Sequence, residues 1–152
     1  MQSRETILNA LCDLLATTQF AEPINGQSTW ATLSRRLKLW SDVSSADQPA
    51  LFIVEHSENA AYASEMAPPK ITLNVDLFIY VAAGKDPGAI PARDLNIALD
   101  ALADCLAPSV SDQRQTLGGL VSHCRIEGRI LKDPGDLDGQ GLAVAPIKIL
   151  AP

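Results

Sequence analysis

The chain has 152 residues, of which 47% are hydrophobic and 20% charged, a balance typical of folded domains and not of disordered chains. This length supports one hydrophobic core, so we predict a single domain over residues 1–152. The net charge of −6 argues against a general nucleic-acid binder, which needs a basic face to neutralise phosphates.

The first predicted element is a helix from Arg4 to about Thr17, with Ser3 placed to cap it. Its apolar residues recur every three or four positions and share one face: Ile7, Leu8, Leu11, Leu14 and Leu15. Charged residues interrupt this segment where a signal peptide would be apolar, and no apolar run reaches the roughly 18 residues of a membrane span. We therefore expect a cytoplasmic protein.

A weak alternation over residues 32–40 predicts a strand with charge on both faces, which favours a position at a sheet edge or an interface. Three cations in it, Arg35, Arg36 and Lys38, lie close to Trp40. Arg and Trp are enriched at protein interfaces, so we take these four residues as interface candidates. An equally weighted alternative is a solvent-exposed edge strand whose charges prevent pairing with other chains. After a loop over 41–49, the apolar run 50–56 predicts a strand buried on both faces.

Residues 57–69, SENAAYASEMAPP, have no periodicity and predict a long loop, of the kind that usually carries function in a compact domain. Tyr62 and Glu65 are its candidate interface residues. The clearest pattern in the sequence follows at 70–84 and predicts a long strand with one buried face. The buried face consists of Ile71, Leu73, Val75, Leu77, Ile79 and Val81, and the opposite face changes from polar to aromatic halfway along.

A second amphipathic helix is predicted between Pro91 and Pro108. A strand over 120–130 follows, entered through a Gly-Gly turn, and its alternating charges form a further candidate interface: Arg125, Glu127 and Arg129. Turn residues fill 133–141. The last predicted strand, 141–150, contains Pro146, which cannot donate a backbone hydrogen bond and therefore indicates an edge position or a bulge.

The predicted order is helix, strand, strand, strand, helix, strand, strand. Loops join most of the strands, which favours antiparallel pairing. The predicted fold class is α+β, with a mainly antiparallel sheet of about five strands and two amphipathic helices on one face.

The pair His123–Cys124 is the most reactive combination in the sequence, because a cysteine nucleophile needs a nearby base. Neighbours on a strand point to opposite faces, so we expect Cys124 in the core and His123 on the other face. The remaining cysteines, Cys12 and Cys105, form no Cys-x-x-Cys motif and are expected to be reduced thiols. We predict no enzyme, no cofactor and no metal site.

As a whole, the chain resembles the tail terminator, or tail completion, proteins of long-tailed bacteriophages, including prophage-encoded minor tail proteins. The resemblance lies in the order and spacing of segments over nearly the full length: RETILNALCDLL, SRRLKLWSDV, QPALFIVE, ITLNVDLFIYV, TLGGLVSHCRIEGRI and APIKIL. The family implies an α+β subunit that assembles as a hexameric ring on the end of the tail tube. There it stops tube elongation and offers a surface to the head-side connector.

This resemblance implies a structural protein of the virion tail, assembled in the host cytoplasm. Its implied partners are other copies of itself, the tail tube protein and the head–tail connector protein, with no membrane and no specific nucleic-acid binding. Two alternatives stay open. One is a small cytoplasmic ligand- or metal-binding α+β domain that uses His56, His123 and the acidic loops. The other is a neighbouring tail-tube or head–tail joining subunit of the same particle.

Overall fold

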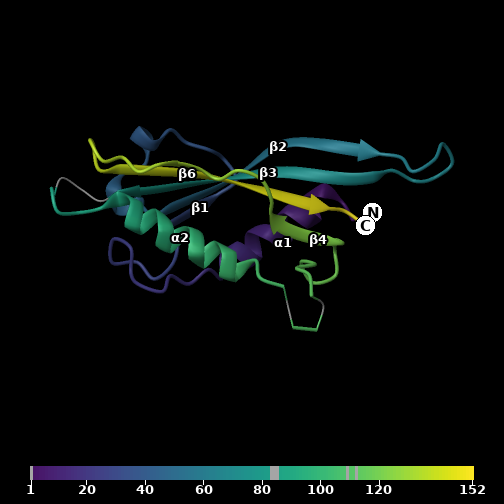
Figure 1. The fold of residues 1–152 in the computed structure, drawn as a ribbon, viewed down its shortest axis with the longest axis horizontal. Helices are drawn as coiled ribbons and strands as arrows, with labels where there is room; N and C mark the ends of the chain where they lie inside the picture. Colours follow the sequence, from purple (N-terminus) through teal and green to yellow (C-terminus); the bar gives the residue numbers. More distant parts are fainter. Residues whose placement is uncertain (1, 83–85, 109, 112) are drawn as a thin grey trace.

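The computed structural model describes residues 2–82, 86–108, 110–111 and 113–152, and within them two helices lie against one face of a mixed six-stranded sheet (Figure 1). The predicted α+β class is confirmed. The strand order is β1-β2-β3-β6-β4, and β5 also pairs with β6. The strands are β1 (Thr32–Ser34), β2 (Ala50–Ala61), β3 (Lys70–Ala82), β4 (His123–Ile126), β5 (Leu131–Asp133) and β6 (Gln140–Leu150). All pairs are antiparallel except β1 with β2.

Both predicted helices are present, as α1 (Arg4–Leu15) and α2 (Pro91–Cys105). Ser3 caps α1 as expected, because its hydroxyl accepts a hydrogen bond of 3.1 Å from the backbone N–H of Thr6. The helices bury the faces that their periodicity predicts, and Pro91 occupies the first turn of α2, where its missing N–H costs nothing. The predicted helical faces therefore become one side of the core.

The strand β3 has the predicted alternation over residues 70–82 and lies in the middle of the sheet, and the predicted residues 83–84 lie outside the described part of the chain. Its helix-facing residues from Leu73 to Val81 are buried, together with alternate residues of β2 and β6. A second, smaller apolar cluster lies on the opposite face of the sheet and contains Val43, Ala50, Phe52 and Tyr80. We call this opposite side the second face. The sheet thus has one fully covered face and one that is covered in part.

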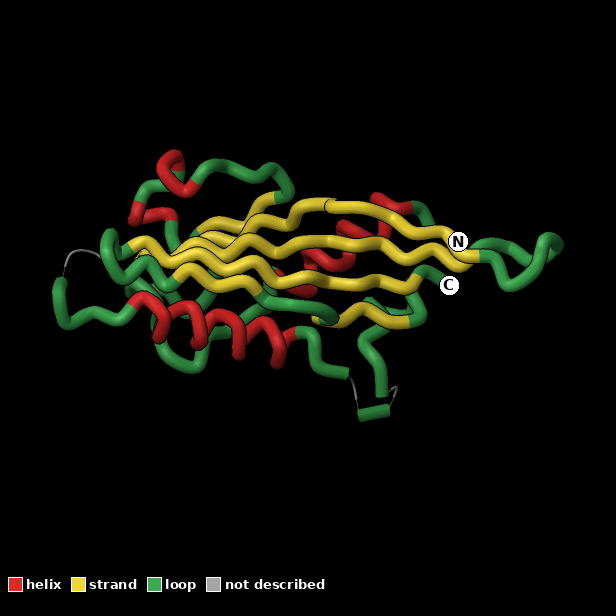
Figure 2. The backbone as a smooth tube through the Cα atoms, turned by 45° about the horizontal axis from the view of Figure 1, so that its top comes forward, coloured by secondary structure: helices red, strands yellow, loops and turns green. Residues whose placement is uncertain are grey.

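The predicted strand over 32–40 is wrong beyond Ser34. Only β1 pairs with the sheet, in parallel with β2 and at the edge, as its charges suggested. Residues after it fold over the second face through two short 3₁₀ turns, Trp40–Asp42 and Ser45–Asp47 (Figure 2). The Tyr80 hydroxyl holds this segment by donating a 2.6 Å hydrogen bond to the carbonyl of Lys38.

The strand β2 is longer than predicted, because residues 57–61 continue it and only 62–69 connect it to β3. A register shift between Glu55 and Ser57 marks a β-bulge. Beyond this bulge the two strands pair through side chains as well as backbone: the Asn74 amide donates to Ser57 Oγ at 3.0 Å and to Asn59 Oδ1 at 2.8 Å. These exposed residues have no apolar alternation, which is why the sequence did not reveal the strand.

The predicted strand over 120–130 is interrupted. The two short strands β4 and β5 pair with successive parts of β6, and residues 127–130 separate them. Pro146 explains the break: it lies opposite, has no N–H to donate, and its carbonyl accepts from the N–H of Glu127 at 3.1 Å. A Cβ on Gly128 would lie 3.1 Å from the Pro146 ring, and its φ of 121° favours glycine. The prediction of an edge position or a bulge for this strand is therefore wrong: β6 is an inner strand with an unbroken register to β3, and the interruption falls on its other neighbour.

Candidate interaction surface

The hairpin made by β2 and β3 extends well beyond the rest of the molecule (Figure 1). Its connection, residues 62–69, is the hairpin tip, and it contains both residues predicted there, Tyr62 and Glu65. Tyr62 is exposed, and Met66 is 94% exposed. Glu65 is the only charged residue in the tip. The tip therefore presents apolar side chains and one carboxylate to solvent.

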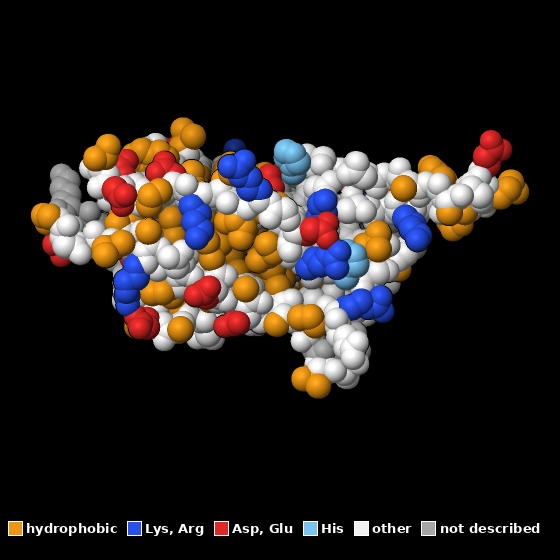
Figure 3. Space-filling view, viewed as in Figure 1, with side chains coloured by type: hydrophobic (Ala, Val, Ile, Leu, Met, Phe, Trp, Pro, Cys, Tyr) orange, Lys and Arg blue, Asp and Glu red, His pale blue; other side chains and the backbone are white. Residues whose placement is uncertain are grey.

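The second face of the sheet carries apolar side chains that nothing in the described residues covers fully. Leu131, Val144 and Phe78 lie opposite one another across β5, β6 and β3. Leu131 is 53% exposed, and the other two are half-buried. Together with three half-buried neighbours they form what we call the open face: Val54, Phe78, Leu131, Leu142, Val144 and Pro146. Figure 3 shows hydrophobic side chains gathered over the middle of the molecule on this side.

A charged cluster borders the open face, on the side nearer to the hairpin. Arg125 donates two hydrogen bonds to Glu127 Oε1, at 2.9 and 2.6 Å, and Lys148 Nζ lies 3.2 Å from Glu127 Oε2. Arg125 and then Lys148 lower the pKa of Glu127 by hydrogen bonding to its charged form. Because two cations share one carboxylate, this charged cluster keeps a net positive charge.

The three predicted charges of this stripe are only partly brought together. Arg125 and Glu127 are in contact, whereas Arg129 is exposed in the interruption beyond Gly128. Lys148, which completes the cluster, was missed by the sequence analysis. It lies directly opposite Arg125 in the β4–β6 register, and no local pattern indicates that pairing.

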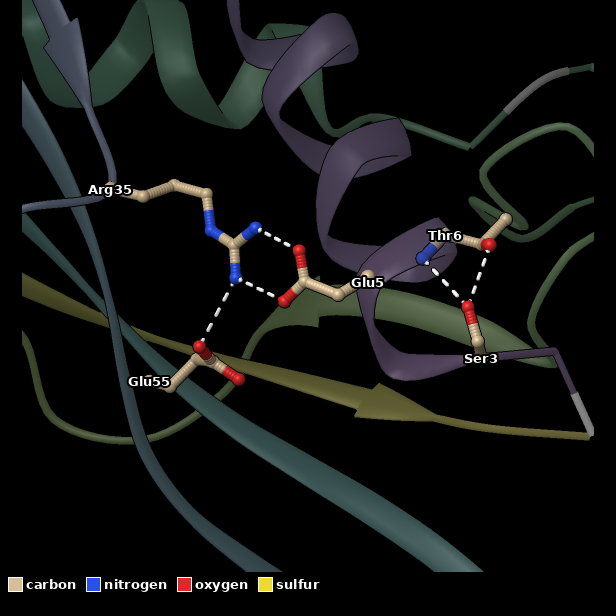
Figure 4. A network of polar contacts seen from close by, with 5 residues as sticks. All are labelled: Ser3, Glu5, Thr6, Arg35 and Glu55. Atoms are coloured by element: carbon tan, nitrogen blue, oxygen red, sulfur yellow. Dashed lines mark hydrogen bonds and ion pairs between the residues drawn. The ribbon is translucent and has the colours of Figure 1, made fainter.

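Arg35, another predicted interface residue, makes ion pairs within the chain. Its guanidinium binds both carboxylate oxygens of Glu5 in α1, at 2.8 and 2.9 Å, and Glu55 of β2 at 3.2 Å (Figure 4). Arg4 binds Glu58 in the same two-pronged way, at 2.5 and 2.9 Å. These pairs join the start of α1 to the edge of the sheet, and they leave Arg35 only partly accessible.

The other candidates from that segment stay at the surface. Arg36 and Lys38 are exposed, and Trp40 is exposed next to Leu39. They lie on the segment that covers the Tyr80 end of the second face. Most of the predicted interface residues thus fall into three separate places, namely the hairpin tip, the charged cluster and this covering segment, whereas Arg35 is engaged in ion pairs and Arg129 lies outside the charged cluster.

The ion pair between Arg35 and Glu5 predicts that stability depends on pH. Hydrogen bonding to Arg35 lowers the pKa of Glu5, so this carboxylate contributes stability above its unfolded pKa and loses it as the pH falls through the lower folded value. We expect Arg35→Met to return the pKa of Glu5 toward its ordinary range, measured by NMR titration of the side-chain carboxyl. Arg36→Met is the control, because Arg36 is exposed and lies in no described ion pair with Glu5. An unchanged pKa of Glu5 in Arg35→Met would contradict the pairing.

The residues considered for catalysis do not form a site. Cys124 faces the helices opposite Ile149, whereas His123 lies opposite Leu150 on the second face, so the pair is separated by the sheet as predicted. His56 occupies the β-bulge, where its Nδ1 lies 3.4 Å from Asp76 Oδ2. Among the described residues no group of three His, Cys, Asp or Glu side chains is arranged to hold a metal ion.

One small cavity lies beside this bulge, between Leu8 of α1 and Leu73 of β3, with His56 at its margin. Its volume of about 160 Å³ is well below the several hundred Å³ typical of small-molecule sites.

No helix in the described part of the chain is long and apolar enough to cross a membrane. No protein-family model matches the sequence, and a search of curated proteins found no match.

Proposed function

We propose that this protein is a structural subunit of a bacteriophage tail, which caps the tail tube as a ring, stops its elongation and offers a surface for head joining. The observation that carries the proposal is the projecting β2–β3 hairpin with Tyr62 and Met66 exposed at its tip. Exposed apolar side chains on a protruding element are typical of binding surfaces. The sequence resemblance to tail terminator proteins supports the same function.

The proposed mechanism is binding without catalysis. A ring that binds the tube end better than the next tube subunit does will stop elongation. Six identical weak contacts acting together supply that margin through avidity, so each subunit needs only a modest affinity. The proposed partners are other copies of the chain, the tail tube protein and the head–tail connector, in the virion tail and, during assembly, in the host cytoplasm.

Solution mass across a concentration series tests this proposal directly. Six subunits of 16.2 kDa give a particle of about 97 kDa, and we expect light scattering to detect that mass. Negative-stain images of the same fraction are expected to show rings, and rings of this mass are expected to shorten or cap tubes when added to assembling tails. Rings that leave tube length unchanged would overturn the terminator function.

A ligand-binding domain is the competing function, favoured by the small cavity, by the His56–Asp76 contact and by open hollows of about 390 to 440 Å³ around the start of α2. Its signature is a melting temperature that rises when Zn²⁺ or another ligand is added, because a ligand that binds only the native state stabilises it. We expect no such rise. A strong metal-dependent rise in a protein that stays monomeric at every concentration would favour the binding domain over the tail protein.

A further inference from the structure

We propose that copies of this chain associate head to tail, with the hairpin tip of one copy docked on the open face of the next. The inference rests on the proposed ring-forming function and names the two surfaces that would build the ring. It commits to a second copy of this chain as the occupant of the open face. Shape, apolar character and charge each support that choice.

The open face is suited to an apolar partner. An antiparallel sheet with one solvated face normally carries polar residues there. Here Leu131, Val144 and Phe78 instead form a continuous row across three strands, because side chains opposite each other on paired strands lie about 5 Å apart. Val54 and Pro146 extend this row toward the charged cluster, since both lie opposite Asp76 in the neighbouring row. The result is an apolar strip with one carboxylate, Asp76, between Val54 and Pro146, and with the charged cluster beyond it.

The hairpin tip has the complementary chemistry. It offers Tyr62 and Met66 for the apolar strip, and both are exposed. Its single charge, Glu65, is negative, whereas Arg125 and Lys148 at the margin share only one carboxylate, that of Glu127. Asp76 on the same face lies against His56 and in no described ion pair with Arg125 or Lys148, so a second carboxylate arriving with the tip would balance the surplus cation of the cluster. Because Glu65 is attracted to the charged cluster, the tip would dock with its carboxylate at the end of the strip where the cluster lies.

The tip cannot reach the open face of its own molecule. Both belong to the same sheet, and Phe78 on the open face lies eight positions along β3 from Lys70 at the tip end. At about 3.3 Å per residue, an extended strand places them roughly 26 Å apart. The contact is therefore between molecules, and because the two surfaces differ it is heterologous, the type of contact that builds a ring when the rotation between neighbours closes.

Engineered disulfides test the contact. The double variant Met66→Cys with Leu131→Cys is first assembled and then mildly oxidised. We expect covalent dimers and larger covalent oligomers on a non-reducing gel. The matched control is Met66→Cys with Leu137→Cys, because Leu137 is fully exposed but lies in the loop before β6, away from the open face. Variants that carry only one of the added cysteines measure the background cross-linking through Cys12 and Cys105. Equal cross-linking of both double variants would overturn the inference.

Charge exchange gives a second, independent readout. Glu65→Lys places a cation beside the charged cluster, and we expect it to weaken self-association by about ten-fold or more. Adding Lys148→Glu to this variant is expected to recover much of the lost affinity. The melting temperature of each variant shows whether it is folded, and Lys148→Glu alone controls for effects within the charged cluster.

The outcomes separate this inference from the proposed function. A particle of ring mass that shows no Met66–Leu131 cross-link, and no loss with Glu65→Lys, overturns the contact and leaves the proposed function standing. Selective cross-linking with charge rescue, in rings that do not act on tubes, supports the contact and overturns the tail function. A chain that stays monomeric at every concentration overturns the contact.

Discussion

Replacing Leu77 by alanine is expected to lower the free energy of unfolding by about 3–5 kcal/mol. Leu77 is 0% exposed, lies near the middle of β3, and faces the helices between β2 and β6. Truncation removes apolar contacts and leaves a cavity that strands paired on both sides cannot collapse around. The loss is a large share of the roughly 5–15 kcal/mol that stabilises a typical domain.

Urea denaturation followed by circular dichroism measures this loss. Leu137→Ala is the matched control, because it removes the same atoms from a fully exposed side chain, and we expect a change within about 0.5 kcal/mol. The midpoint for Leu77→Ala is expected to fall without a change in the denaturant dependence. A loss below about 1 kcal/mol would show that Leu77 does not lie in a tightly packed core.

The thiol of Cys124 is expected to react with iodoacetamide about a thousand-fold more slowly in the folded protein than an ordinary exposed thiol. Burial raises its pKa to about 12, and the thiolate is the reactive form. At pH 8 a shift from about 9 to about 12 lowers the thiolate fraction by close to three powers of ten. Steric protection acts in the same direction, because only 1% of the residue is exposed.

Labelling at pH 8, with the modified cysteines located by mass spectrometry, checks this expectation. Cys12 is the internal comparison, since burial raises its pKa too but the residue is only partly buried. In urea all three thiols are expected to react at similar rates. Native-state labelling of Cys124 as fast as that of Cys12 would restore the reactive-cysteine hypothesis for the His123–Cys124 pair.

The sequence predicted the elements in which one periodicity dominates. The six alternating apolar residues of β3 and the three- and four-residue spacing in α1 and α2 each describe a face that is buried against the core. From these elements and the loops between strands, the α+β class followed. Burial on one face imposes an apolar periodicity on the local sequence, and this periodicity can be recognised without knowing which element packs against that face.

Elements that form through pairing alone were missed or given the wrong limits. Residues 57–61 extend β2 with both faces in solvent, so no apolar alternation marks them. The short strand β5 is likewise exposed along its length and owes its existence to β6. Strand formation in these places depends on a neighbour distant in the sequence, which propensity and periodicity do not include.

The sequence indicated which residues belong to the candidate surface, but it did not show which of them the fold brings together. Tyr62 and Glu65 lie at the exposed tip, as expected for residues of a long connection. The partners of Arg35 lie 30 and 20 residues away, so nothing local showed that this cation is engaged within the chain. The open face combines residues from four strands, and its sign in the sequence was the change from polar to aromatic residues on the second side of the predicted strand 70–84.

The position of β6 has a consequence for biosynthesis. It is the last strand of the sheet along the chain, yet it lies between β3 and β4. While the ribosome is still making residues 140–150, β3 has an unpaired edge, and neither β4 nor β5 has a partner. Such an edge is a site for pairing with other chains, so the nascent protein is most prone to aggregation just before synthesis of this strand ends. A premature stop codon ahead of Gln140 would remove the middle of the sheet and not its margin.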